Sequence, residues 1–348
     1  MFHYILLVCI KYIKSERSIN NIYYLLKGKK STQTIQDAYL FQLTNFFGIY
    51  PQVEKNTFNN FVTQLLNNQL IKHVNNDFVI ITTYGETYLN NNKRPLYFNG
   101  LNYNKIDRAY LQSIILLIQT TTNLANGNNR FIPVIEDYQV QKIVKKVLQT
   151  KLNNPEVICS SVYKDLHTLL DSYNGDDRVK EMFVMYLTSN NEIGHSMQQL
   201  AETYKMSIED VYCELMNLIH YQLSEIEQNR SAFLFLPNLI GTKNVELLTD
   251  SAKRTYELLL KSHTVKEISQ IRLLKENTIY DHIVEIAYQF PVNIYHYMSV
   301  EVYEKIRYVL DELHTTKLKE LKSKLPDSVT YFQIKLAIAI TYRNRNEE

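Results

Sequence analysis

Side chains that can contact phosphates and base edges gather in one stretch near the C-terminus, between residues 263 and 287. Cationic groups suit phosphate oxygens, and amide, hydroxyl and phenol groups suit the donors and acceptors on base edges. The members of this set are Lys266, Arg272, Lys275, Asn277, Thr278 and Tyr280. Three carboxylates at outward positions, Glu276, Asp281 and Glu285, would repel phosphates. These residue types therefore indicate binding of a nucleic acid. The three acids make sequence-specific reading of bases less favourable.

Two short helices must position these side chains. Thr264 is placed to accept a hydrogen bond from the backbone near Glu267, which completes a capping box and starts the first helix. Leu274 fills the turn, and Asn277 is placed to cap a second helix. The second helix buries an apolar stripe of Ile279, Ile283 and Ile286. The pattern predicts a helix-turn-helix, whose second helix can enter a DNA major groove, and a packing module is an equal alternative.

A second basic cluster lies near the N-terminus, where residues 1–30 carry six basic side chains and one acidic side chain. A glycine-containing turn leads there into a helix that Ser31 or Thr32 starts, and a helix N-terminus favours an anion such as phosphate. The residues assigned to this candidate site are Lys27, Lys29, Lys30, Ser31 and Gln33. A solvated loop explains the same residues equally well. The net charge of the whole chain is only +2, which argues against extensive coating by nucleic acid.

Motifs for catalysis and metal binding are absent from the sequence. No H-E-x-x-H, G-x-S-x-G, Walker or dinucleotide-binding glycine motif occurs. The cysteines Cys9, Cys159 and Cys213 form no C-x-x-C unit. We therefore expect no enzyme, no catalytic residue, no metal, no cofactor and no small-molecule substrate. No apolar stretch is long enough to cross a bilayer, so we expect a cytoplasmic protein without a membrane partner.

The fold class follows from the spacing of the apolar residues and from the positions of glycine and proline. Few glycines and prolines, with apolar residues at helical intervals, predict a mainly α protein. Helices followed by a hairpin near 70–82, with a polar tip at 75–77, predict an N-terminal winged helix at residues 1–92. The segment 90–104 is the best boundary because Pro95 and Gly100 interrupt it. We expect a helical middle domain at 105–247 and a C-terminal helix-turn-helix domain at 248–348.

The middle domain contains a second unit of helix-turn-helix type. Ser196 and Ser207 are placed to cap helices at 197–204 and 208–218. Three acids are expected on the exposed face of the later helix, where they would repel phosphates: Glu209, Asp210 and Glu214. We therefore predict that this unit packs rather than binds DNA, and we interpret His220 as a structural residue.

Several stretches carry a resemblance to a known family. They are KGKKSTQTIQD at 27–37, EIS at 267–269, RLLKENTI at 272–279, His282-Ile283, and YFQIKLAIA at 331–339. Together they resemble the YpbB-like proteins of low-GC Gram-positive bacteria. The C-terminal unit is similar to the helix-turn-helix type found at the ends of RecQ-type DNA helicases, although Leu273 stands where many such turns carry glycine.

The resemblance implies an accessory protein without established catalytic activity that works with a RecQ-type helicase. The first hypothesis is thus a non-enzymatic helix-turn-helix protein of DNA repair or replication that binds branched or duplex DNA, the helicase, or both. A transcriptional regulator that reads an operator as a dimer is the alternative. A third possibility is that the helix-turn-helix units serve only as scaffolding.

Overall fold

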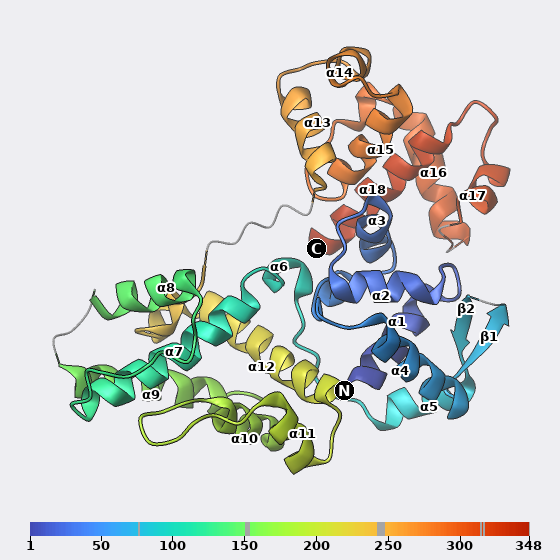
Figure 1. The fold of residues 1–348 in the computed structure, drawn as a ribbon. Coiled ribbons are helices and arrows are strands. Elements are labelled where there is room, and N and C mark those ends of the chain that lie inside the picture. Colours follow the sequence, from blue (N-terminus) through green and yellow to red (C-terminus); the bar gives the residue numbers. More distant parts are fainter. Residues whose placement is uncertain (76, 150–153, 242–247, 314, 316, 348) are drawn as a thin grey trace. The chain divides into compact units, whose positions relative to one another are not determined.

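The structure, a computed structural model, describes residues 1–75, 77–149, 154–241, 248–313, 315 and 317–347. In these residues it contains eighteen α-helices and one two-stranded antiparallel sheet (Figure 1). The expected fold class is confirmed, because the described part of the chain is mainly helical, contains a single hairpin and ends in a helical domain with a helix-turn-helix. Contacts divide the chain into two compact units, residues 1–8, 61–70 and 83–244, and residues 9–60, 71–82 and 245–348.

The first unit is helical. Its elements are the start of α1 (Phe2–Ile13), the end of α4 (Lys55–Asn67), α5 (Thr83–Asn91), α6 (Gly100–Tyr103), α7 (Asp107–Ala125), α8 (Tyr138–Gln149), α9 (Pro155–Asp171), α10 (Asp177–Tyr186), α11 (Met197–Tyr204), α12 (Ile208–Gln228), η2 (Arg230–Ala232) and η3 (Leu236–Asn238). The long helix α12 packs against α7, α10 and α11. Leu215, Leu218 and Ile219 of α12 are fully buried, so this helix forms the centre of the unit's core.

The second unit joins the N-terminal helices to the C-terminal ones. Its elements are the rest of α1 and α4, α2 (Ile19–Lys27), α3 (Thr32–Leu40), η1 (Thr44–Phe46), β1 (Ile71–Asn75), β2 (Phe78–Ile81), α13 (Asp250–Leu260), α14 (Val265–Arg272), α15 (Glu276–Ala287), η4 (Ile294–His296), α16 (Val300–Leu313), α17 (Leu318–Lys324) and α18 (Tyr331–Glu347). The units group residues by contact and not by position along the chain. The division into 1–92, 105–247 and 248–348 therefore stays a prediction.

Helix α15 is the centre of the second unit and packs against α3, α13, α14 and α18. The predicted apolar stripe of Ile279, Ile283 and Ile286 is fully buried. Val284 and Ala287 are buried as well, so neighbours surround the C-terminal half of α15. An amphipathic helix with one buried stripe would leave Val284 exposed, because it points about 160° away from Ile286. Only the first turns of α15 reach the surface.

A close approach of two glycines shapes the turn between α2 and α3. Gly28 ends α2 with a φ of +67°, in the left-handed region where glycine carries no steric penalty. A β-carbon at Gly28 would lie 2.8 Å from the Cα of Gly48. Ser31 then caps α3, because its side chain accepts from the backbone N–H of Thr34. The predicted start of this helix at Ser31 or Thr32 is confirmed, with Ser31 as the cap.

The hairpin that follows α4 has the expected position. Strands β1 and β2 pair antiparallel with Ile71 opposite Ile81, and the register shifts between His73 and Asn75. Residue 76, in the predicted tip, lies outside the described residues. The hairpin thus has the place in the chain that a wing requires, directly after α4.

Candidate nucleic-acid interface

The first helix of the motif is capped as its sequence predicts. Thr264 Oγ1 accepts from the backbone N–H of Glu267 at 3.3 Å, and Glu267 Oε2 accepts from the backbone N–H of Thr264 at 2.8 Å. These hydrogen bonds lower the pKa of Glu267. The capping box is confirmed, and it holds Lys266 on the exposed side of α14.

The turn between α14 and α15 closes without glycine. Leu273 adopts a φ of +52°, the left-handed conformation that usually selects glycine at this place. The N–H of Leu274 donates to the carbonyl of Ser269 at 3.0 Å, and the Ser269 hydroxyl donates to the carbonyl of Leu274 at 2.7 Å. Leu274 is half-buried in the turn. These bonds fix the direction in which α15 leaves the turn.

The expected cap at Asn277 is wrong. Helix α15 begins at Glu276, and its N-cap residue is Lys275, whose side chain makes no capping bond. Asn277 therefore lies within the first turn, exposed, and its side-chain amide has no hydrogen-bonding partner among the described residues. Lys266 and Lys275 are exposed too, whereas Thr278 is half-buried. The groups offered to a ligand here are two ammonium groups and one amide.

Arg272 faces the interior of the second unit. Its Nη1 donates to the carbonyl of Ser251 at 2.7 Å and to the Thr255 hydroxyl, and its Nη2 donates to the Ser251 hydroxyl at 3.0 Å. Burial, with nearby Arg254, lowers the pKa of Arg272. The guanidinium thus ties α14 to α13, which leaves few of its donors for a phosphate.

His282 belongs to the same network and is buried. Its Nδ1 lies 2.9 Å from the Thr255 hydroxyl and 3.3 Å from Arg272 Nη1. Arginine can only donate, so Nδ1 must be the accepting nitrogen of a neutral ring. Burial, with Arg272 nearby, lowers the pKa of His282 to about 4.

The three acids of α15 have three different environments. Glu276 is exposed. Asp281 is exposed but lies 3.0 Å from Lys335 Nζ of α18. Glu285 is fully buried, so its expected outward position is wrong. The repulsion of phosphates at this face comes mainly from Glu276.

Glu285 holds three elements together instead. Its Oε1 accepts from the backbone N–H of Thr249 at 2.5 Å, just before α13. Its Oε2 accepts from the Thr32 hydroxyl of α3 at 2.7 Å and from the Thr249 hydroxyl at 3.3 Å. Nearby, Tyr39 of α3 stacks on Tyr288 with ring centroids 5.1 Å apart. Helix α3 therefore packs where a simple helical wheel would place solvent.

The N-terminal cluster at 27–33 is largely engaged in local contacts. Lys27 Nζ donates to the carbonyl of Val53 at 3.3 Å, and Lys29 Nζ lies 4.1 Å above the ring of Tyr24. Gln33 Nε2 donates to Asp37 at 2.8 Å. Ser31 uses its hydroxyl as the α3 cap, and Lys30 is exposed. The backbone N–H groups of residues 28, 29 and 31 also donate within the turn, so few remain for an anion.

The two basic clusters lie in one unit but not at one place. Thr32 contacts Glu285 in the last turns of α15, whereas Lys275 and Asn277 stand at its start. Ten helical residues span about 15 Å. The clusters are thus separate patches along α15.

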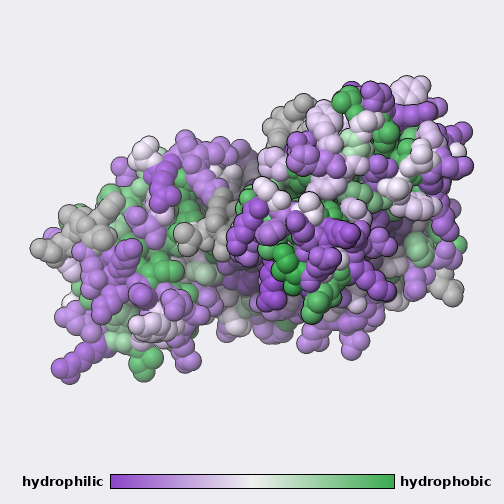
Figure 2. All heavy atoms as spheres, turned by 90° about the horizontal axis from the view of Figure 1, so that it is seen from above, coloured by the Kyte–Doolittle hydropathy of each residue, from purple (hydrophilic) through white to green (hydrophobic). Residues whose placement is uncertain are grey.

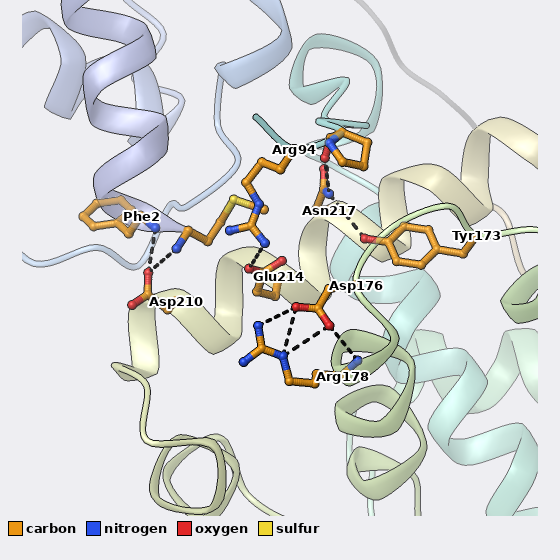
Figure 3. A network of polar contacts seen from close by, with 10 residues as sticks. Phe2, Arg94, Tyr173, Asp176, Arg178, Asp210, Glu214 and Asn217 are labelled. Atoms are coloured by element: carbon orange, nitrogen blue, oxygen red, sulfur yellow. Dashed lines mark hydrogen bonds and ion pairs between the residues drawn. The ribbon is translucent and has the colours of Figure 1, made fainter. Parts of the chain in front are cut away.

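The second unit of helix-turn-helix type has its caps as predicted. Ser196 forms a capping box with Gln199, and the Ser207 side chain accepts from the backbone N–H of Asp210. The prediction of an exposed acidic face is wrong, however, because Glu214 is buried and Glu209 and Asp210 are half-buried. Figure 3 shows the contacts of Asp210 and Glu214. Asp210 Oδ1 lies 2.7 Å from the Met1 amino nitrogen, and Glu214 pairs with Arg94 at 2.7 Å. These acids lock α12 to other elements of the first unit.

The electrostatics of the two acids differ. Burial raises the pKa of Glu214, and Arg94 opposes that shift only in part. Burial would also raise the pKa of Asp210, but the ammonium group of Met1 holds it below its ordinary value. Asp176 and Arg178 form a separate pair at 2.6 Å beside them (Figure 3). The ion pairs of Asp210 and Glu214 thus join α12 to the start of α1 and to the chain after α5.

His220 is a buried structural residue, as expected. Its Nδ1 accepts from the backbone N–H of Asn99 at 2.9 Å, which leaves Nε2 to donate to Asp107 at 3.1 Å. Both side chains are fully buried. Among the residues that the structure describes, no group of three or more His, Cys, Asp or Glu side chains is arranged to hold a metal ion. In the same residues, no helix has the length and apolar character to cross a membrane.

Comparison with known proteins agrees with this geometry. A family described as helix-turn-helix domain matches residues 251–338. Residues 251–338 form a helix-turn-helix domain. Almost the whole chain also resembles Protein YpbB of Bacillus subtilis (strain 168), with 29% identity over 346 residues, which are 97% of this chain and 96% of that protein. The expected resemblance is confirmed. No solved structure matches the chain.

The helix-turn-helix domain suggests DNA binding, and its geometry decides which predicted residues remain available. Lys266, Lys275 and Asn277 lie on its surface. Arg272 is engaged inside it, and Tyr280 is half-buried with its ring 4.3 Å from that of Phe332. Sequence reasoning missed Phe332 and Lys335, which α18 brings to α15 from more than fifty residues away. No local pattern could have found them.

Proposed function

We propose that this protein is a non-enzymatic DNA-binding protein that acts with a RecQ-type helicase in DNA repair or replication. The observation that carries the DNA part is the exposed first turn of α15, which presents Lys275 and Asn277 from a helix-turn-helix domain. In such domains the N-terminal residues of the second helix are the ones that meet base edges. Helix α15 is buried from His282 to Ala287, so it offers no long reading face.

The contact is mainly with phosphates. Lys266 and Lys275 supply positive charge, while Glu276 opposes close approach to the backbone. Each neutralised phosphate contributes a slope of about −0.9 to the dependence of log affinity on log salt for duplex DNA. Two lysines account for a slope of about −2. This arrangement favours binding that depends little on base sequence.

A salt series with the full chain tests this half of the proposal. Fluorescence anisotropy on duplex and forked DNA is measured between low and moderate salt for the parent chain, for a Lys266→Ala, Lys275→Ala double variant and for Lys305→Ala. Lys305 is an exposed lysine of α16 and serves as the matched control. The double variant is expected to lose about 2 from the salt slope, and the control is expected to match the parent. If the affinity does not change with salt, or if no binding is measured, the proposed DNA binding is wrong.

The helicase part rests on the resemblance of the sequence and on exposed apolar side chains at the motif. Ile271 is 55% exposed and Leu273 is 91% exposed, an arrangement that supports a protein contact beside the DNA contact. Hydrophobic side chains also appear between hydrophilic ones on the face drawn in Figure 2. Neither Ile271 nor Leu273 is needed for a phosphate contact.

Co-elution with a purified RecQ-type helicase, and the helicase's rate of unwinding a forked duplex, test this half. An Ile271→Ser, Leu273→Ser double variant is expected to lose co-elution while keeping DNA affinity. If the parent chain neither co-elutes with the helicase nor changes the unwinding rate, the partnership is wrong. A dimer that protects half-sites at fixed spacing would support a transcriptional regulator instead.

A further inference from the structure

A groove with aromatic walls lies beside the first turn of α15. It has a volume of about 590 Å³ and is formed by α15, η4 and the start of α18. Its aromatic side chains are Tyr280, His296, Tyr297, Tyr331 and Phe332, and its polar ones include Asn277 and Lys335. We propose that this groove receives an unpaired nucleobase from single-stranded DNA next to a duplex. The inference deepens the proposed DNA binding and rests on it.

The walls are preorganised. The ring centroids of Tyr280 and Phe332 are 4.3 Å apart, and Tyr297 meets Phe332 edge-on with centroids 5.5 Å apart and planes at 85°. Gln333 fastens α18 to η4, because its Nε2 donates to the carbonyl of Tyr297 at 3.0 Å. Tyr331 is 48% exposed and has no ring partner among the described residues. Its ring is therefore available to stack on a base.

The polar groups suit the edge of a neutral heteroaromatic ring. Asn277 offers a donor and an acceptor, the pair that hydrogen bonding to a base requires. Asp281 and Lys335 neutralise each other at 3.0 Å, so the charges in the groove are balanced. A charged metabolite would find no unpaired countercharge in this pair. A base, whose phosphate stays outside near Lys275, fits these groups better.

The position of the groove selects an unpaired base. It adjoins the exposed first turn of α15, so DNA held by Lys275 would pass its opening. Bases inside a duplex are stacked and cannot enter a side pocket without leaving the helix. A single-stranded tail can enter without that cost, since its bases are already unpaired. The protein is therefore expected to bind DNA at a junction between duplex and single strand.

The test compares a blunt duplex with the same duplex carrying a single-stranded tail. Anisotropy gives the two affinities for the full chain, and 2-aminopurine in the tail next to the junction reports stacking through its fluorescence. The parent chain is expected to prefer the tailed DNA by about tenfold and to quench the probe. Tyr331→Ala should abolish both effects while changing duplex affinity less than about twofold. Tyr331→Phe should keep them, because stacking needs the ring and not the hydroxyl.

Tyr308→Ala is the matched control, since Tyr308 is a 69% exposed tyrosine of α16 that does not line the groove. It should behave as the parent. Two results would overturn base binding in the groove and leave the proposed DNA binding intact. One is duplex binding without any preference for the tail, and the other is a preference that survives Tyr331→Ala. No binding to any DNA overturns both. If Tyr331→Ala fails to fold, an unquenched probe in the parent complex still overturns the inference.

Discussion

The contrast between Glu285 and Glu276 offers the sharpest check on the second unit. Both acids belong to α15, yet Glu285 is fully buried and Glu276 is exposed. Replacing Glu285 by alanine removes the acceptor for the backbone N–H of Thr249 at 2.5 Å and for the Thr32 hydroxyl at 2.7 Å. Hydrogen bonds to a charged group contribute about 1.5–3 kcal/mol each. Release of a desolvated carboxylate offsets part of that loss.

Glu285→Ala leaves three donors unsatisfied, the backbone N–H and hydroxyl of Thr249 and the hydroxyl of Thr32, and its expected destabilisation is about 3 kcal/mol. For a unit of this size it lowers the melting temperature by roughly 6–12 °C. Circular dichroism melts measure the loss, and anisotropy on duplex DNA well below the melting range measures affinity. The affinity of Glu285→Ala should stay within about twofold of the parent, because the side chain does not reach the surface.

Glu276→Gln is the matched variant and should show the opposite pattern. Its stability should fall by less than about 1 kcal/mol, the usual contribution of a carboxylate in the first turn of a helix. Its DNA affinity at low salt should rise about fivefold, because one repulsive surface charge disappears. If Glu285→Ala melts like the parent and binds DNA more tightly, Glu285 faces the ligand. The packing of α3 against α15 would then be wrong.

Two further predictions concern the buried network behind the motif. Arg272→Ala should destabilise the domain by about 2 kcal/mol, because the guanidinium donates to Ser251 and Thr255, and Arg272→Lys should restore only part of that stability in urea unfolding. His282 should make stability depend on pH: its pKa is lowered to about 4 in the folded chain, so protonation favours unfolding. Stability should be complete above about pH 6.5 and fall by up to about 1.4 kcal/mol per pH unit down to about pH 4. Unfolding free energies across that range should lose this slope in His282→Gln, and an unchanged slope contradicts the assignment.

Local signals in the sequence determined the helices and their ends. Thr264, Ser196 and Ser207 cap helices as their positions predict, since a capping bond joins groups only three residues apart. The stripe of Ile279, Ile283 and Ile286 is buried for a similar reason, because helical periodicity brings these residues to one side. The predicted cap is wrong at α15, where Lys275 and not the better capping residue Asn277 precedes the helix.

Tertiary structure alone decided which polar side chains of the motif remain available. A helical wheel assumes one buried side, but α3 covers α15 from a position about 250 residues earlier in the chain and takes Glu285 out of solvent. Arg272 turns inward because α13 supplies its acceptors, and Asp281 is paired because α18 brings Lys335 beside it. The aromatic groove likewise forms because α18 lies beside α15 and η4, which are more than thirty residues earlier in the chain. Contacts of this range depend on how helices pack, and periodicity within one helix carries no information about them.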